Sequence, residues 1–197
     1  MTRVLVYTTL LVAFVAATGL TISAIFVPEW INYDTPSSTG GRVTKTMGLH
    51  RSCSSIDHTC HPALQYNDCK VEDRYFCSMW RSAGFIMSFA AVLEMATIVA
   101  YVMVLSGGKQ KRETGWKLLT FLLVLVGLLQ CTAMAIVAYL FDNDDRFFVG
   151  WKLAKSWIFC IVSWVIAIIS AAALSLSVYV FPPEGGYELI PSERYHR

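Results

Sequence analysis

Four long apolar runs constrain this sequence more than any other feature. The first, residues 4–26, contains no charged side chain. Three more follow at about residues 83–105, 118–141 and 157–181, and Glu94 is the only charged residue within them. A helix rises ~1.5 Å per residue, so about 20 apolar residues cross the ~30 Å hydrocarbon layer. We therefore predict four membrane-spanning helices that form one domain over residues 1–197.

Composition agrees with a membrane protein. Apolar residues make up 55% of the chain and charged residues only 15%, and the charges lie between the apolar runs. The net charge of +2 gives no basic surface of the kind that binds nucleic acid. A cleaved signal peptide is the alternative for residues 4–26, but such peptides have a shorter apolar core of ~7–15 residues.

The orientation follows from the basic residues between the second and third runs. Residues 107–117 hold the densest group of Lys and Arg, and short basic loops stay in the cytoplasm. Four spans then place both termini and the tail, residues 182–197, in the cytoplasm. Residues 27–80 and a short loop at 142–155 are expected outside, and the plasma membrane is the expected location.

Four of the six cysteines lie in the large outer loop: Cys53, Cys60, Cys69 and Cys77. Disulfides persist on this oxidising side, so we predict two of them, and the spacing alone leaves all three connectivities open. Asp57, His58 and His61 beside Cys60 could instead bind a metal, although a disulfide would consume the thiol. We expect no metal and no cofactor.

The same loop contains stretches that suit short antiparallel strands. Residues 41–47 and 68–72 alternate or carry β-branched side chains, and residues 36–41 are rich in Pro, Ser and Gly, which is typical of a turn. We therefore expect a small disulfide-linked antiparallel sheet above the bundle.

Several motifs of this loop resemble those of one known family. Trp30 follows the first run, Gly48-Leu49 precedes Cys53, Cys69 follows, and Arg81 opens the second run. This order is similar to that of the claudin and peripheral myelin protein superfamily, although His50 stands where that family usually has Trp. The resemblance covers the whole chain in topology and the first outer loop in motif.

The resemblance implies a fold and several roles. The fold would be a membrane all-α four-helix bundle with a small disulfide-linked antiparallel β-sheet in the first extracellular loop. The family disulfide would join Cys53 to Cys69, which leaves Cys60 with Cys77 as an additional bridge. Trp30 would anchor the sheet at the membrane surface, and Arg81 would close the join between sheet and bundle.

Glu94 is the residue whose position most needs an explanation. A charged carboxylate in the middle of a span costs at least ~2.5 kcal/mol, so Glu94 either faces the bundle interior or is protonated. Gln130 in the third run is its best polar partner by depth. An interhelical hydrogen bond is the plainer interpretation, and ion or proton handling is the alternative.

Two shorter motifs suggest contacts with other molecules. Phe147-Phe148-Val149 in the second outer loop could bind a partner or could simply lie in the membrane interface. In the tail, Tyr187 and Ile190 have the spacing of a sorting signal that endocytic adaptors read.

The sequence contains no nucleotide-binding loop and no hydrolytic constellation, so we expect no enzyme and no catalytic residue. The expected function is that of a structural or organising protein, in a cell junction or elsewhere in the plasma membrane. It would associate laterally with itself or with another integral membrane protein. The alternatives are an accessory subunit of a channel, transporter or membrane enzyme, and an ion-conducting or transport protein.

Overall fold

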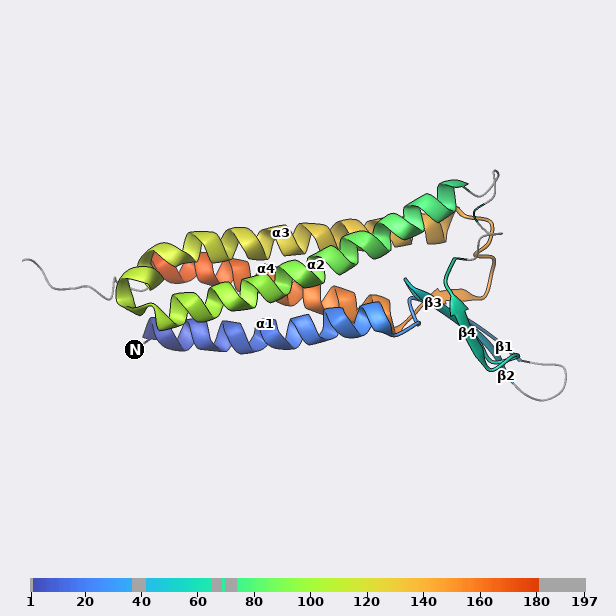
Figure 1. Cartoon of the computed structure of the whole chain (residues 1–197), viewed down its shortest axis with the longest axis horizontal. Helices are drawn as coiled ribbons and strands as arrows, with labels where there is room; N and C mark the ends of the chain where they lie inside the picture. Colours follow the sequence, from blue (N-terminus) through green and yellow to red (C-terminus); the bar gives the residue numbers. More distant parts are fainter. Residues whose placement is uncertain (1, 37–41, 65–68, 70–73, 181–197) are drawn as a thin grey trace, which may run out of the picture.

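The computed structural model describes residues 2–36, 42–64, 69 and 74–180. Its four long helices are α1 (Thr2–Phe26), α2 (Arg74–Ser106), α3 (Gly108–Asn143) and α4 (Lys155–Val180). All four are long and apolar enough to cross a membrane. They lie side by side as one elongated bundle, and the α2–α3 turn is at the same end as the N-terminus (Figure 1).

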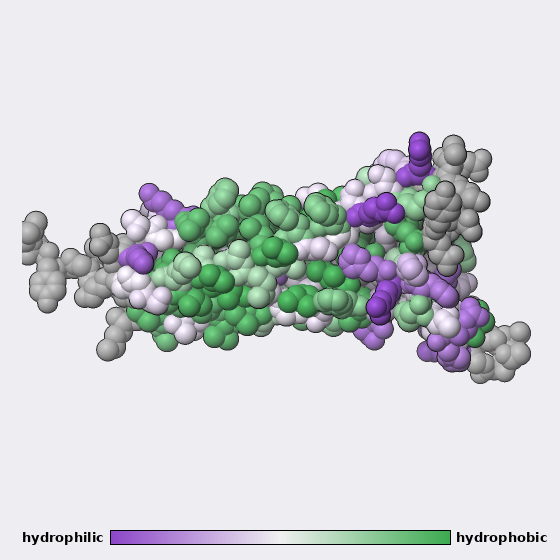
Figure 2. Space-filling model, in the orientation of Figure 1, coloured by the Kyte–Doolittle hydropathy of each residue, from purple (hydrophilic) through white to green (hydrophobic). Residues whose placement is uncertain are grey.

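The surface of the bundle is apolar along its length. Hydrophobic residues cover the helices, whereas hydrophilic residues gather at the two ends of the molecule (Figure 2). Large apolar side chains are exposed on every helix, for example Leu5, Phe85, Phe121 and Ile169. Lipid tails are as apolar as these side chains, so their exposure has no cost in a bilayer. The chain is a multi-pass membrane protein.

A five-stranded antiparallel sheet stands at the other end of the bundle (Figure 1). Its order is β4-β3-β2-β1-β5. The strands are β1 (Ile31–Pro36), β2 (Arg42–Met47), β3 (Arg51–Ser54), β4 (Thr59–Pro62) and β5 (Trp151–Leu153). β5 comes from the connection between α3 and α4, where the sequence predicted only a loop. A three-residue strand is too short to show a period-2 pattern.

Two helices extend beyond the predicted spans. α2 begins at Arg74 and not near residue 83, and α3 begins at Gly108, so the basic segment 107–117 is mostly helical. Apolar runs mark where a helix enters lipid, not where it begins. Lys, Arg and Gln are good helix formers, so the basic residues at 109–112 continue the α3 helix beyond the apolar run. The chain reverses at Gly108, whose φ of +79° suits glycine.

Some predictions fall on parts of the chain outside the described residues. They are most of the strand at 68–72, most of the turn at 36–41 and the tail with Tyr187 and Ile190. The strand at 41–47 matches β2, which begins at Arg42.

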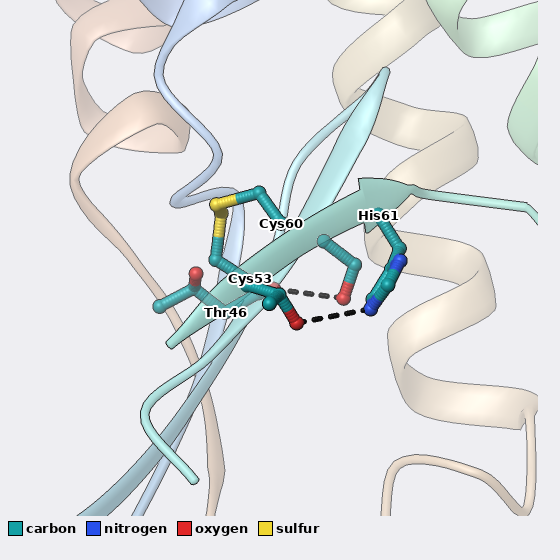
Figure 3. The surroundings of a disulfide bond; sticks show 6 residues. Thr46, Cys53, Cys60 and His61 are labelled. Carbon is teal, nitrogen blue, oxygen red and sulfur yellow. Dashed lines mark hydrogen bonds between the residues drawn. A yellow bond between two sulfur atoms is a disulfide. The ribbon is translucent and has the colours of Figure 1, made fainter. Parts of the chain in front are cut away.

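Both disulfides differ in pairing from those that the family resemblance implied. The structure pairs Cys53 with Cys60 (Figure 3) and Cys69 with Cys77, so the pairs Cys53–Cys69 and Cys60–Cys77 are wrong for this structure. The reason is the β3–β4 hairpin, in which Cys53 lies directly opposite Cys60 with 4.2 Å between their Cα atoms. Such close cross-strand positions are typical of antiparallel pairs. Because β4 occupies the place beside β3, Cys69 joins the first turns of α2 instead.

Trp30 connects the sheet to the bundle. Its side chain is fully buried, and the indole nitrogen donates a hydrogen bond to the Ala24 carbonyl oxygen over 2.6 Å. The Trp30 backbone donates to Met47 of β2 and accepts from Ala154 just before α4. Trp30 therefore joins α1, the sheet and the start of α4. The role that the resemblance implied for it, anchoring the sheet at the membrane surface, stays a prediction.

Gly48 and Leu49 lie at the same junction. A Cβ atom on Gly48 would come within 2.5 Å of the Pro28 Cα atom, so only glycine allows the end of β2 to approach this backbone so closely. Leu49 is buried in the cluster that also contains Trp30 and Trp80. These motif residues are therefore architectural.

The role that the resemblance implied for Arg81, closing the join between sheet and bundle, stays a prediction. Its side chain is exposed, and it makes no ion pair or hydrogen bond with any part of the chain that the structure describes. Among the described residues, Trp30 and its neighbours connect the sheet to the bundle.

Candidate functional site: a polar cluster that joins all four helices

Four polar side chains meet in the interior of the bundle, one from each helix. They are Thr21 of α1, Glu94 of α2, Gln130 of α3 and Ser163 of α4, and all four are fully buried. Thr21 is close to the end of α1 at Phe26, so the cluster lies in the half of the bundle nearer the sheet.

Helical periodicity explains why these side chains meet. The buried face of α2 contains Met87, Ala90, Glu94, Thr97 and Tyr101, which recur every three or four residues. The other three helices bury side chains at the same spacing, so each cluster residue lies on the face that its helix turns to the bundle axis.

Gln130 is the centre of the hydrogen bonding. Its amide nitrogen lies 2.7 Å from Oε1 of Glu94, 2.9 Å from the Thr21 hydroxyl oxygen and 3.1 Å from the Ser163 hydroxyl oxygen. The amide has two hydrogens, so it donates to two of these three acceptors at a time. The cluster therefore contains more acceptor positions than this amide can satisfy at once.

The two hydroxyl groups complete the network. Thr21 donates to Oε1 of Glu94 over 2.9 Å, and the Thr21 and Ser163 hydroxyls lie 2.7 Å apart. Glu94 thus accepts hydrogen bonds from α1 and α3 on the same carboxyl oxygen. Breaking any one helix away from the bundle would leave polar atoms unpaired in an apolar interior, which is costly.

Two atoms of the cluster have no hydrogen-bond partner among the described residues: Oε2 of Glu94 and Oε1 of Gln130. A carboxylate can only accept hydrogen bonds, whereas a carboxylic acid also donates one. None of the ion pairs between described residues includes Glu94. The cluster can therefore fix helix packing and can take up or release one proton.

The sequence indicated half of this cluster. Gln130 was the expected partner of Glu94, and the structure brings the two side chains into contact. Thr21 and Ser163 were missed, because threonine and serine in helices commonly bond their own backbone, as Thr18 does with the Phe14 carbonyl oxygen. Only their position on the buried face could have distinguished them.

A second feature lies outside the span, where the sheet faces the ends of α2 and α3. A cavity of about 680 Å³ is lined there by residues that include Lys45, Met47, Phe76, Arg146, Phe147 and Trp151. Its floor is aromatic, since the Phe147 ring lies 6.0 Å from that of Phe76 and 5.6 Å from that of Trp151. The Arg146 guanidinium lies over the Phe76 ring at 4.5 Å. We call this feature the sheet groove.

Of the motif Phe147-Phe148-Val149, only Phe147 lines this groove. Phe147 packs inward, whereas Phe148 is 57% exposed and Val149 is 98% exposed. Phe148 touches Tyr33 of β1 with 5.3 Å between the ring centroids, and Tyr33 in turn touches Trp151. Ile56, which lines the groove, is 68% exposed.

The cysteine and histidine residues of β4 do not form a metal site in the described part of the chain. Cys60 is in a disulfide, and no group of three His, Cys, Asp or Glu side chains that could hold a metal ion occurs among the described residues. His61 instead pairs with the Thr59 hydroxyl at 3.0 Å (Figure 3).

No protein-family model matches the chain, and no curated protein matches its sequence. The function therefore has to be inferred from the geometry of the chain itself.

Proposed function

We propose that this chain is a claudin-like organising protein of the plasma membrane. It acts by associating with itself or with another integral membrane protein, and it has no enzymatic activity. The sheet and its groove face the cell exterior, and both termini lie in the cytoplasm, as the basic segment at 107–117 favours.

The observation that carries this proposal is the set of apolar side chains exposed beside the sheet groove. Phe148, Val149 and Ile56 lie beyond the helix ends, where water and not lipid would cover them. Exposed apolar groups next to an aromatic cavity and charged residues are typical of a protein contact surface. Lys45 and Arg146 line the groove and add charge at its border.

The polar cluster supports the same function. Hydrogen bonds from Thr21, Gln130 and Ser163 connect all four helices, so the bundle provides a rigid base that holds the groove in one orientation. Preorganised surfaces bind partners at a lower entropic cost.

Photocrosslinking from the groove tests the proposal. In one variant a photoreactive amino acid replaces Val149. In the control variant it replaces Lys152 of β5, which is exposed and alternates along the strand with the groove-lining Trp151, so it lies on the other face of the sheet. In native membranes the Val149 probe should form one discrete protein adduct, and the Lys152 probe should not. Gentle detergent extraction and native mass measurement then identify the adduct.

The mass of the adduct distinguishes the possible partners. Multiples of this chain indicate self-association, and one larger protein at a fixed ratio indicates an accessory subunit. Adducts with lipid alone, or equal protein adducts from both positions, would refute the proposal.

A further inference from the structure

A second cavity lies along the first turns of α2, at the sheet end of the bundle. It has a volume of about 620 Å³. It is lined by the Cys69–Cys77 disulfide and by Arg74, Ser78, Arg81 and Ser82 of α2, which precede Phe85 and Ile86 along the helix. The four polar residues recur at helical spacing, so they lie on one face of α2.

The two arginines are available for a ligand. Both side chains are exposed, and neither forms an ion pair or a hydrogen bond with another residue that the structure describes. They are two turns apart, so both guanidinium groups can reach into one cavity. A guanidinium group binds a phosphate through two parallel hydrogen bonds, and the hydroxyls of Ser78 and Ser82 on the same face of α2 supply further donors.

The same face of α2 continues as an apolar stripe below the cavity. Its exposed side chains recur every three, four or seven residues: Phe85, Phe89, Val92, Val99 and Met103. Phe85 follows Arg81 by four residues, about 6 Å along the helix axis. The cationic cavity is therefore at the headgroup level and is continuous with a surface that contacts lipid tails.

We infer that this cavity binds a phospholipid of the leaflet at the sheet end. Arg74 and Arg81 hold the phosphate, Ser78 and Ser82 donate to its oxygens, and an acyl chain follows Phe85 and Phe89 down the helix. The two arginines together carry more positive charge than one phosphate neutralises, so an anionic phospholipid binds more tightly than a zwitterionic one.

Native mass spectrometry of the purified full chain tests this site. The protein is titrated with phosphatidylglycerol, and retained lipid is counted for wild type and for the double variant Arg74→Gln/Arg81→Gln. We expect the apparent affinity to fall about tenfold or more, the size expected from two arginine contacts with lipid phosphate. The matched control is Arg42→Gln/Arg51→Gln, which removes the same charge from exposed arginines of the sheet and should leave lipid binding unchanged.

Two further measurements test how the phosphate and the acyl chain are held. Arg74→Lys/Arg81→Lys keeps the charge but loses the two-point geometry, so its affinity should lie between those of wild type and the Gln variant. Inorganic phosphate should fail to displace the bound lipid, because it cannot occupy the apolar stripe. Equal lipid retention in all variants, or displacement by inorganic phosphate alone, would overturn the inference.

The thermal unfolding midpoint of each variant is recorded in the same detergent, because a misfolded variant would also lose lipid. If the double Gln variant does not fold, the single variants Arg74→Gln and Arg81→Gln replace it. Each single variant should then show about half of the decrease in the logarithm of lipid affinity that is expected for the double variant. An unchanged lipid affinity in both single variants would overturn the inference.

Discussion

In the bundle, four fully buried polar side chains are hydrogen-bonded across helices, whereas polar side chains of the sheet are half-buried or exposed. Glu94 and Gln130 are fully buried, while every residue of β4 is exposed. Lipid gives helices no hydrophobic reason to associate, so the bundle depends on close packing and hydrogen bonds. The sheet, which lies beyond the helix ends, depends on apolar burial at its base and on disulfides.

Close packing in the bundle is visible at Gly127. A Cβ atom there would lie 2.7 Å from the Ile168 side chain, so glycine lets α3 approach α4. The base of the sheet instead buries large aromatic residues, among them Trp30, Phe76 and Trp80. This difference predicts which substitutions damage each region.

The largest expected effect is that of Trp30→Ala. This change removes a fully buried indole from the junction and should lower the free energy of unfolding by about 3–5 kcal/mol. The measurement is unfolding of the purified protein in micelles. Phe121→Ala is the control, because Phe121 is exposed on the lipid-facing surface and should change stability little. Equal losses in the two variants would contradict the proposed role of Trp30.

The next largest effect should follow from Cys53→Ser/Cys60→Ser. Opening this short loop should cost about 2–3 kcal/mol and should loosen only the sheet, so the helical circular dichroism signal stays near that of wild type. Peptide mapping of the unreduced wild-type protein provides the direct check. It should find Cys53 linked to Cys60 and Cys69 linked to Cys77, and a Cys53–Cys69 peptide would contradict the pairing in the structure.

The sequence predicted the bundle more completely than the sheet. A span is a local property of an uninterrupted apolar run, so the four helices could be located from composition alone. Strand pairing is not local. β5 joins β1 across more than a hundred residues of sequence, and no short pattern around Trp151 indicates that contact.

The disulfides and the polar cluster show the same limit. All four loop cysteines could be assigned to disulfides from their number and location, but the partners depend on whether β4 lies beside β3. In the cluster, Glu94 and Gln130 were conspicuous because such side chains are rare in spans. Thr21 and Ser163 are ordinary residues for a helix in lipid, and only the assembled bundle distinguishes them.

Substitutions in the polar cluster should lower the free energy of unfolding less than substitutions at the base of the sheet. Two variants of Glu94 measure the size of this loss. Glu94→Gln keeps an acceptor for Gln130 and Thr21, so the loss should be about 0.6 kcal/mol or less. Glu94→Leu leaves those donors short of an acceptor and should cost about 1–3 kcal/mol. Unfolding in micelles gives both values. If Glu94→Gln lowered the free energy of unfolding as much as Glu94→Leu does, the carboxyl group would have a role beyond hydrogen bonding.

The smallest predicted effect compares two serines of α4. Ser163→Ala removes hydrogen bonds to α1 and α3, whereas Ser175→Ala removes only a bond to the Ala171 carbonyl oxygen of the same helix. A hydrogen bond between helices in lipid is worth about 0.6 kcal/mol on average, so Ser163→Ala should be the more destabilising by about that amount. The difference should also vanish in a Glu94→Leu background if the cluster acts as one unit, because the network is already broken there. A Ser163→Ala effect that is unchanged in that background would show that the Ser163 hydrogen bonds contribute independently of Glu94, and that the cluster does not act as one unit.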